Sequence, residues 1–113
     1  MKNDTLLTTT DRVELLVNGL NSGIDHWPAV KLFMPDGAAT WLLTECDPDE
    51  PDRLFGLCDL GLGYPELGYV NLTEIMEIRG RLGLPVERDL HFVADKPLSA
   101  YADEARANGR IIA

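Results

Sequence analysis

The sequence predicts an α+β fold, in which a single domain of residues 1–113 holds an antiparallel sheet of about five strands and two to three helices. A chain of 113 residues has room for one domain with one hydrophobic core. Its strand-like segments follow one another through short turns, which favours antiparallel pairing with the helices on one face of the sheet. Helix signals near both ends give the element order α-β-β-β-β-α-β-α.

The first helix is predicted over residues 10–20. Thr10 is its expected N-cap, because a threonine hydroxyl can accept a hydrogen bond from a backbone N–H of the first turn. Apolar residues recur at helical spacing and form one face, which consists of Val13, Leu16, Val17 and Leu20. The Asn21-Ser22-Gly23 segment ends the helix.

Four strands are predicted next, over residues 30–34, 39–46, 53–59 and 66–70, because each is a short apolar run between turn residues. The Pro35-Asp36-Gly37 turn joins the first two strands into a hairpin. The stretch 55–69 places glycines among large apolar residues, at Gly56, Gly61, Gly63 and Gly68. Because glycine loses much backbone entropy on folding, we expect these residues at sharp bends or close backbone approaches.

The C-terminal third is predicted to contain a helix, a fifth strand and a last helix. A helix is predicted from residue 71 to about residue 81, because Asn71 and Glu74 have the spacing of a capping box and glycine and proline follow the last turn. Residues 86–93 are a predicted fifth strand. Residues 98–107 are a predicted last helix, with Asp95 as its candidate cap and Gly109 as its end.

The negative net charge of the chain indicates which classes of partner it can bind. Ten Lys+Arg residues against nineteen Asp+Glu give a net charge of −9, which argues against direct nucleic-acid binding because phosphates favour basic surfaces. The expected acidic surface consists of Asp47, Asp49, Glu50 and Asp52, with Asp36 across the hairpin. It is a candidate site for a basic protein partner, steered by its electrostatic field. The alternative is a solvated loop.

The sequence lacks the signals that are typical of several classes of protein. No segment approaches the roughly 20 apolar residues of a membrane span, and the N-terminus lacks a signal-peptide core, so we expect a cytoplasmic protein that binds no membrane. Neither Cys46 nor Cys58 has the spacing of a zinc site. The glycine run lacks the Lys-Ser/Thr of a phosphate loop, and no catalytic triad motif is present. We therefore expect no cofactor and assign no catalytic residue.

One alternative depends on the predicted strand of residues 86–93. Alternate residues of a strand share a face, which places Glu87, Asp89 and His91 together. Two carboxylates and an imidazole on one face suit a divalent metal ion or acid–base chemistry. The other interpretation is an outer face in contact with water.

Arg88 falls on the opposite side of that strand, with Leu90 and Phe92. A buried guanidinium without a partner would be very costly. We therefore expect a structural ion pair between Arg88 and Asp59 or Glu66. Substrate anchoring is the alternative.

Several segments carry a family resemblance. They are KLF (31–33), PDG (35–37), TWLL (40–43), FGLCDLGLG (55–63), PELGY (65–69), ERDLHF (87–92) and PLSAY (97–101). Together they resemble a small uncharacterised bacterial family that is classed only as a domain of unknown function. By this comparison residues 1–29 are a helix with a variable lead-in, and residues 30–113 are the family-like core.

The resemblance implies an accessory protein of plasmids, phages and integrative elements, encoded near genes for DNA maintenance and anti-restriction. Small inhibitors of host defence are common among such proteins. The resemblance implies no catalytic residue, because none is established for the family.

Three functions follow from these observations. The first is an acidic, non-enzymatic binding protein of a mobile genetic element. It would be a counter-defence inhibitor of the anti-CRISPR or anti-restriction kind that occludes a basic nucleic-acid-binding surface of a host protein. The second is a small metal-assisted hydrolase or nucleic-acid-processing enzyme that uses Glu87, Asp89 and His91, and Asp59 as a further candidate. The third is an adaptor subunit for plasmid transfer or replication proteins.

Overall fold

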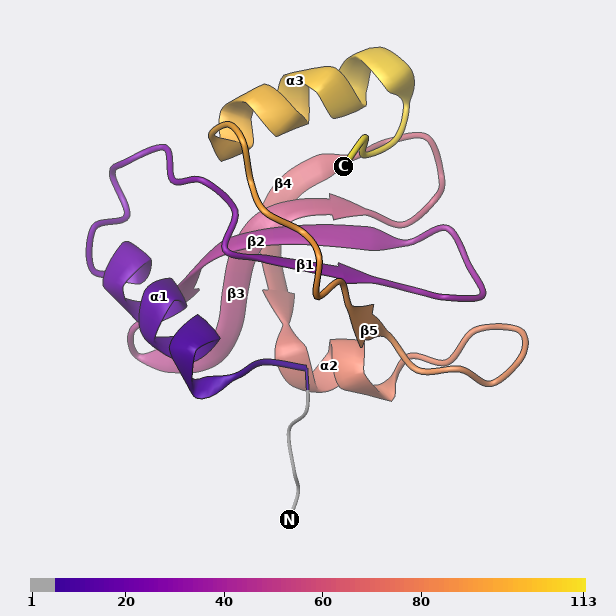
Figure 1. Cartoon of the computed structure of the whole chain (residues 1–113), viewed down its shortest axis with the longest axis horizontal. Coiled ribbons are helices and arrows are strands. Elements are labelled where there is room, and N and C mark those ends of the chain that lie inside the picture. The colour runs from indigo at the N-terminus through magenta and orange to yellow at the C-terminus, as the bar shows by residue number, and fades with distance from the viewer. Residues whose placement is uncertain (1–5) are drawn as a thin grey trace.

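The computed structural model describes residues 6–113, whose arrangement is shown in Figure 1. Within these residues the helices are α1 (Thr9–Gly19), α2 (Leu72–Glu77) and α3 (Leu98–Asn108). The strands are β1 (Val30–Phe33), β2 (Thr40–Asp47), β3 (Glu50–Asp59), β4 (Glu66–Asn71) and β5 (Glu87–Arg88). This confirms the predicted α+β class and the predicted order of elements.

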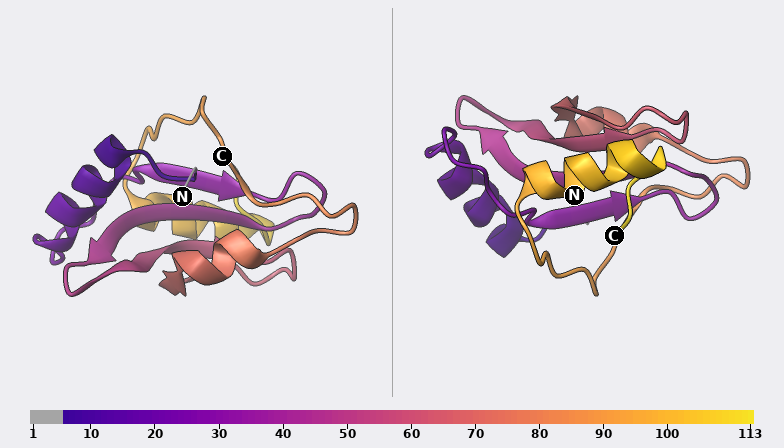
Figure 2. Two further views of the ribbon diagram at one scale, coloured as in Figure 1. Left: turned by 90° about the horizontal axis from the view of Figure 1, so that it is seen from below. Right: turned by 90° about the horizontal axis from the view of Figure 1, so that it is seen from above.

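The strands form one antiparallel sheet in the order β4-β3-β2-β1-β5. Helices α1 and α2 pack on one face of this sheet and α3 packs on the other (Figure 2). The prediction that the helices cover one face only is therefore wrong. The reason lies in the central strand β2, where Trp41, Leu42 and Leu43 are consecutive and all buried. Such a run needs cover on both faces.

The two faces hold separate apolar clusters. One contains Leu15 of α1 and Leu72 of α2, which pack with Trp41 and other residues of the sheet. The other contains Leu42 and Leu57, which pack against α3. Full burial of one such leucine contributes roughly 1.5–3 kcal/mol, so each layer stabilises the sheet.

The N-cap of α1 is Thr8, not the predicted Thr10. Thr8 Oγ1 accepts a hydrogen bond from Asp11 N (3.0 Å), and Asp11 Oδ2 accepts one from Thr8 N (2.8 Å). This capping box satisfies two backbone N–H groups that the helix itself leaves free. It also holds Asp11 on the inner side of α1, where Asp11 forms an ion pair with Arg88.

The glycine run turns the chain between β3 and β4. Gly61 and Gly63 have φ values of 82° and 89°, which residues with a Cβ atom rarely adopt. Gly56 lies inside β3, where a Cβ atom would stand 2.0 Å from the carbonyl oxygen of Leu42. Gly68 differs, because a Cβ atom on it would meet nothing within 4 Å.

Helix α2 and strand β5 are shorter than predicted. Helix α2 ends at Glu77, because the next residue is already extended (ψ 137°) and a turn from Gly80 to Gly83 follows. Strand β5 contains only Glu87 and Arg88 instead of residues 86–93. The strand ends there because Asp89 Oδ1 accepts a hydrogen bond from His91 N (2.9 Å), which closes a side-chain turn.

Helix α3 is capped from another part of the chain. Its N-cap residue, Pro97, makes no side-chain capping hydrogen bond. The predicted cap, Asp95, instead accepts a hydrogen bond from the Tyr101 hydroxyl (2.9 Å). Asp25 provides the acceptor, because its Oδ1 binds Ser99 N (3.1 Å). The loop that follows α1 is therefore tied to the start of α3.

Candidate protein-docking surface

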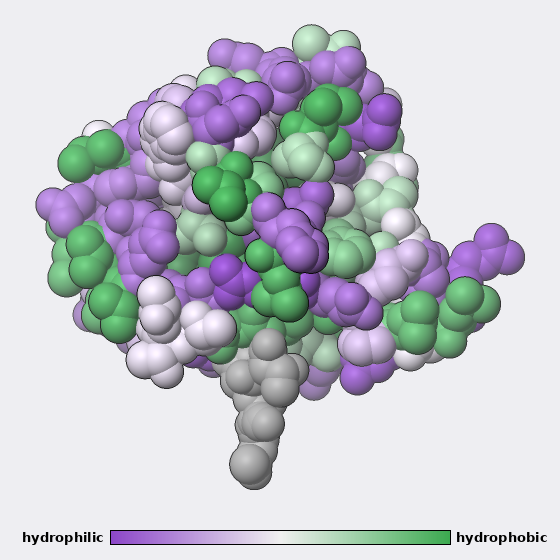
Figure 3. Space-filling model, in the orientation of Figure 1, coloured by the Kyte–Doolittle hydropathy of each residue, from purple (hydrophilic) through white to green (hydrophobic). Residues whose placement is uncertain are grey.

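Helix α1 exposes the face that its sequence makes apolar. The exposed fractions are 55% for Val13, 39% for Leu16, 51% for Val17 and 66% for Leu20. We call these four residues the α1 stripe. Hydrophobic side chains gather over α1 at the left of the molecule in Figure 3. An amphipathic helix normally turns such a stripe towards the core, and an exposed apolar patch marks a candidate interaction surface.

The opposite side of α1 explains why the stripe faces outward. The buried residues of the helix are Asp11, Leu15 and Gly19, which repeat every four positions. Gly19 touches β2 so closely that a Cβ atom would stand 2.0 Å from the carbonyl oxygen of Cys46. Asn18 Nδ2 also donates a hydrogen bond to the Thr44 carbonyl oxygen (2.8 Å). These contacts fix the rotation of the helix.

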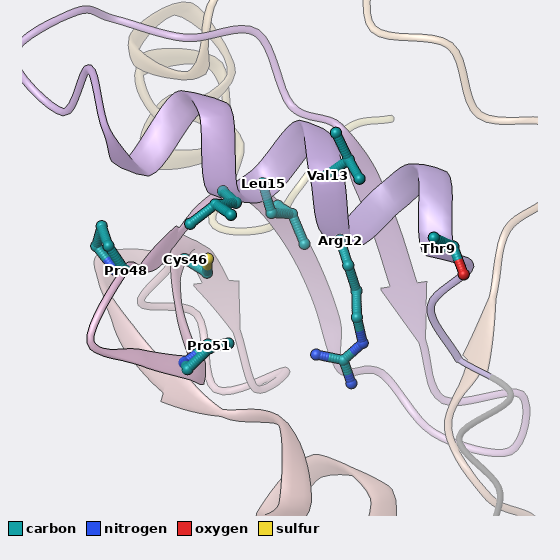
Figure 4. Close-up of a pocket in the computed structure, with 8 residues that line it drawn as sticks. Thr9, Arg12, Val13, Leu15, Cys46, Pro48 and Pro51 are labelled. Atoms are coloured by element: carbon teal, nitrogen blue, oxygen red, sulfur yellow. The ribbon is translucent and has the colours of Figure 1, made fainter.

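A groove of about 240 Å³ separates α1 from the turn between β2 and β3 (Figure 4). Its lining is mostly apolar and consists of Thr9, Arg12, Val13, Leu15, Leu16, Cys46, Pro48 and Pro51. Figure 4 shows α1 on one side of the groove and the two prolines on the other. Because Val13 and Leu16 also belong to the α1 stripe, the groove and the stripe form one continuous surface.

The turn that carries Pro48 and Pro51 is acidic outside the groove. Asp47, Asp49, Glu50 and Asp52 lie at the turn that joins β2 to β3, and we call these four residues the acidic hairpin. Asp52 pairs with Arg12 (3.0 Å) and Asp47 pairs with Arg53 (3.2 Å). Within residues 6–113, Asp49 and Glu50 form no ion pair, and both are exposed. Two carboxylates therefore remain available to a partner.

Asp36 does not belong to the acidic hairpin, contrary to the prediction. It lies in the turn between β1 and β2, at the opposite end of β2. Its Oδ2 accepts a hydrogen bond from Leu82 N (2.7 Å), and its carboxylate is seated against Gly80. Antiparallel strands place successive turns at opposite ends of the sheet, so the two acidic turns cannot meet.

The predicted partners of Arg88 are also wrong. Arg88 pairs with Asp11, and the two side chains are 20% and 8% exposed. Strand β5 lies beside β1, at the opposite edge of the sheet from β4 and Glu66. Asp59 is buried but binds backbone, accepting hydrogen bonds from Gly61 N (2.8 Å) and Ile111 N (2.9 Å).

The candidate metal cluster of Glu87, Asp89 and His91 is not formed. Strand β5 ends at Arg88, so the alternation that would align the three side chains does not continue. Asp89 pairs with Lys31 (3.3 Å), and the hydrogen bond from His91 N is the main cause that lowers the Asp89 pKa. Among residues 6–113, no three His, Cys, Asp or Glu residues are grouped so that they could hold a metal ion.

Both cysteines behave as small apolar residues. Cys46 is buried and lines the groove, and Cys58 is half-buried. Burial raises the pKa of both thiols, that of Cys58 to about 11. Both thiols are therefore protonated at neutral pH, and neither has the thiolate character of a nucleophile.

Comparison with known proteins places the chain in a family. A family model described as "Protein of unknown function (DUF2958)" matches residues 6–112. The chain belongs to this family. No curated protein and no solved structure matches it. The DUF2958 match includes α1 and the acidic hairpin, so the groove lies within the region that defines the family. No helix among residues 6–113 has the length and apolar character needed to cross a membrane.

The sequence did not single out Glu45, which this DUF2958 chain buries on β2. Only 7% of Glu45 is exposed, and no hydrogen bond or ion pair engages its carboxylate within residues 6–113. Burial raises the pKa of Glu45 above its ordinary value of 4.5, and nearby His26 opposes this shift. A largely buried carboxylate without a hydrogen-bond partner is unusual, because only His26 offsets part of its desolvation.

Glu45 is expected to make stability fall as the pH rises. Because its pKa is raised in the folded protein, the folded state holds more protons than the unfolded state just above pH 4.5, and the free energy of unfolding decreases through this window. Replacing Glu45 by Gln removes this dependence. Urea unfolding of the parent and of Glu45→Gln between about pH 4 and pH 7 measures it. The variant should gain stability over the parent as the pH rises, and a constant difference would contradict the desolvation argument.

Proposed function

We propose that this DUF2958 chain is a non-enzymatic protein-binding module whose docking surface combines the α1 stripe, the groove and the acidic hairpin. The α1 stripe carries the proposal, because four apolar side chains on one helix face are left in water. Covering apolar surface contributes roughly 25 cal/mol per Å². A partner that covers the stripe therefore gains binding energy that the isolated chain does not use.

The charges beside the stripe define the chemistry of the partner. Asp49 and Glu50 lie between Pro48 and Pro51 of the groove and form no ion pair inside residues 6–113, and the chain has a net charge of −9. A complementary partner therefore presents apolar side chains next to lysine or arginine. Such opposite charges speed association and select the partner.

The finer proposal is a counter-defence inhibitor of the anti-CRISPR or anti-restriction kind. Host defence proteins hold nucleic acid in basic channels, and an acidic module seated there would occlude the channel. The resemblance to accessory proteins of mobile DNA supports this choice. An adaptor for plasmid transfer or replication proteins would use the same surface, so the identity of the captured partner decides between the two.

Capture of a partner is expected to depend on the stripe and to weaken with salt. The bait is the parent chain in host lysate, compared with Val17→Ser/Leu20→Ser. The control is Leu82→Ser/Val93→Ser, which changes two exposed apolar residues (78% and 84%) outside the surface. Surface substitutions of this kind shift stability by only about 0.5 kcal/mol. Raising the salt from about 0.1 M to about 1 M shortens the Debye length from roughly 10 Å to 3 Å, so recovery should fall.

Expression in a host with an active defence system tests the finer proposal. We expect the parent chain to raise phage plating or plasmid establishment, and Val17→Ser/Leu20→Ser to lose this effect. If no partner is captured and restriction is unchanged by the parent chain, the proposal is wrong. Equal capture by the stripe variant would place the docking surface elsewhere.

A further inference from the structure

A second pocket lies on the α3 face of the sheet, away from the α1 groove. It has a volume of about 180 Å³ and is lined by the loop after α1, strands of the sheet and the start of α3. Its lining consists of Ser22, Ile24, Asp25, His26, Thr44, Glu45, Phe55, Leu67, Leu98 and Ser99. The hydrogen bond between Asp25 and Ser99 holds the loop against α3, so the pocket wall is built by tertiary contacts.

Glu45 is directed into this pocket. It is paired in register with Phe55 across β2 and β3, and residues opposite each other in a sheet point to the same face. Phe55 packs against the cluster beneath α3. Glu45 is 7% exposed, and its carboxylate makes no hydrogen bond or ion pair within residues 6–113. The pocket therefore contains a carboxylate that has no hydrogen-bond or ion-pair partner among residues 6–113, with His26 as the nearby group that opposes its raised pKa.

The rest of the lining selects the ligand. Ile24, Phe55, Leu67 and Leu98 make the walls apolar, whereas Asp25 is already bound to Ser99. A suitable ligand is thus a cation with an apolar stem. A guanidinium fits better than an ammonium group, because it is more weakly hydrated and stacks on aromatic rings. The same sheet face shows such a contact, because the Arg53 guanidinium lies 3.7 Å from the centroid of the Tyr69 ring. Arg53 is also held by Asp47.

We propose that the pocket binds an arginine side chain of a protein partner, with the guanidinium on Glu45 and the methylene stem against Phe55 and Leu67. This inference rests on the proposed function, because it assigns a specific contact to a basic partner. Arginine is a frequent centre of binding energy in protein interfaces. A desolvated carboxylate that gains a bidentate partner provides such a centre.

The test uses a free amino-acid probe and no partner. N-acetyl-arginine amide is titrated into the ¹⁵N-labelled chain, and amide shifts are followed by NMR. We expect saturable shifts at residues 24–26, 45, 55, 67 and 98–99. N-acetyl-citrulline amide has the same shape without the charge and should cause no saturable shift. Equal shifts with citrulline, or tighter binding of the corresponding lysine amide, would overturn the assignment to arginine.

Variants locate the probe. Glu45→Gln should weaken its binding by at least about tenfold, whereas Glu66→Gln, which changes an exposed carboxylate on β4, should not. Leu67→Arg supplies a guanidinium from within the chain and should block the probe, whereas Leu67→Gln should not. Unchanged binding in both Glu45→Gln and Leu67→Arg would refute the site. Because no partner is needed, this result is independent of partner capture through the α1 stripe.

Discussion

Replacing Gly56 by alanine is expected to destabilise the domain by about 3 kcal/mol or more. A Cβ atom at this position would stand 2.0 Å from the carbonyl oxygen of Leu42 and 2.8 Å from the Leu43 Cα atom. These are backbone atoms of the central strand, so the clash cannot be relieved by rotating a side chain. Each kcal/mol lowers the melting temperature of a domain this size by roughly 4 °C. Thermal unfolding followed by circular dichroism should therefore show a decrease of at least about 10 °C.

Gly68 offers a matched control for Gly56. The two glycines are direct partners in the β3–β4 register, yet a Cβ atom on Gly68 would meet nothing within 4 Å. Gly68→Ala should therefore melt like the parent or gain up to about 1 kcal/mol, since alanine restricts the unfolded chain. Equal melting of both variants would mean that β3 does not approach β2 as closely as described.

Replacing Arg88 by alanine is expected to lower the free energy of unfolding by about 3 kcal/mol, the second large effect. Its partner Asp11 has only 8% of its side chain exposed, so the substitution leaves a buried carboxylate without its counter-ion. Removing one partner of a buried pair typically costs roughly 3–5 kcal/mol, and the partial exposure of Arg88 places this case at the lower end. Urea unfolding measures the loss.

Three comparisons separate this ion pair from a general effect on β5. Glu87→Ala alters the exposed neighbour in the same strand and should change stability by no more than about 0.5 kcal/mol. A double-mutant cycle between Arg88→Ala and Asp11→Ala should show coupling of at least about 1 kcal/mol. The cycle between Arg88→Ala and Asp59→Asn should be additive. Coupling to Asp59 and none to Asp11 would reverse the assignment of the pair.

The α1 helix shows what local sequence patterns can and cannot predict. The spacing of Val13, Leu16, Val17 and Leu20 correctly predicts an amphipathic helix. Which side of the helix is buried depends on the tight backbone contact that Gly19 makes with β2. The repeat of Asp11, Leu15 and Gly19 at every fourth position was the available signal, but its meaning requires the neighbouring strand.

Strict alternation gave the wrong side-chain environment for Arg88 of β5, and it would also misplace Glu45 of β2. The prediction for Arg88 assumed that the strand continues to Val93, whereas a side-chain turn at Asp89 ends β5. The prediction also contained no strand order, and the sheet places β5 beside β1. In β2 an irregularity between Leu43 and Glu45 shifts the register. Strict alternation would put Glu45 on the same face as Leu43, and the irregularity moves it to the α3 face. Neither feature follows from spacing alone.

The glycines were predictable as a group but not one by one. Their density in residues 55–69 indicated bends, and Gly61 and Gly63 do adopt positive φ. The close approach at Gly56 and the open space at Gly68 depend on the β2–β3–β4 register. Sequence therefore predicts the turn, whereas the tolerance of each position to a side chain requires the sheet.

Site-specific photocrosslinking in the host tests the docking surface most directly. A benzophenone amino acid replaces Val17 in the α1 stripe or, as the control, Val93, which is 84% exposed on the loop after β5. We expect one defined protein adduct from position 17, reduced by Asp49→Asn/Glu50→Gln, and none from position 93. Absence of an adduct at position 17, or the same adduct from both positions, would contradict the proposal that the α1 stripe and the acidic hairpin bind a partner.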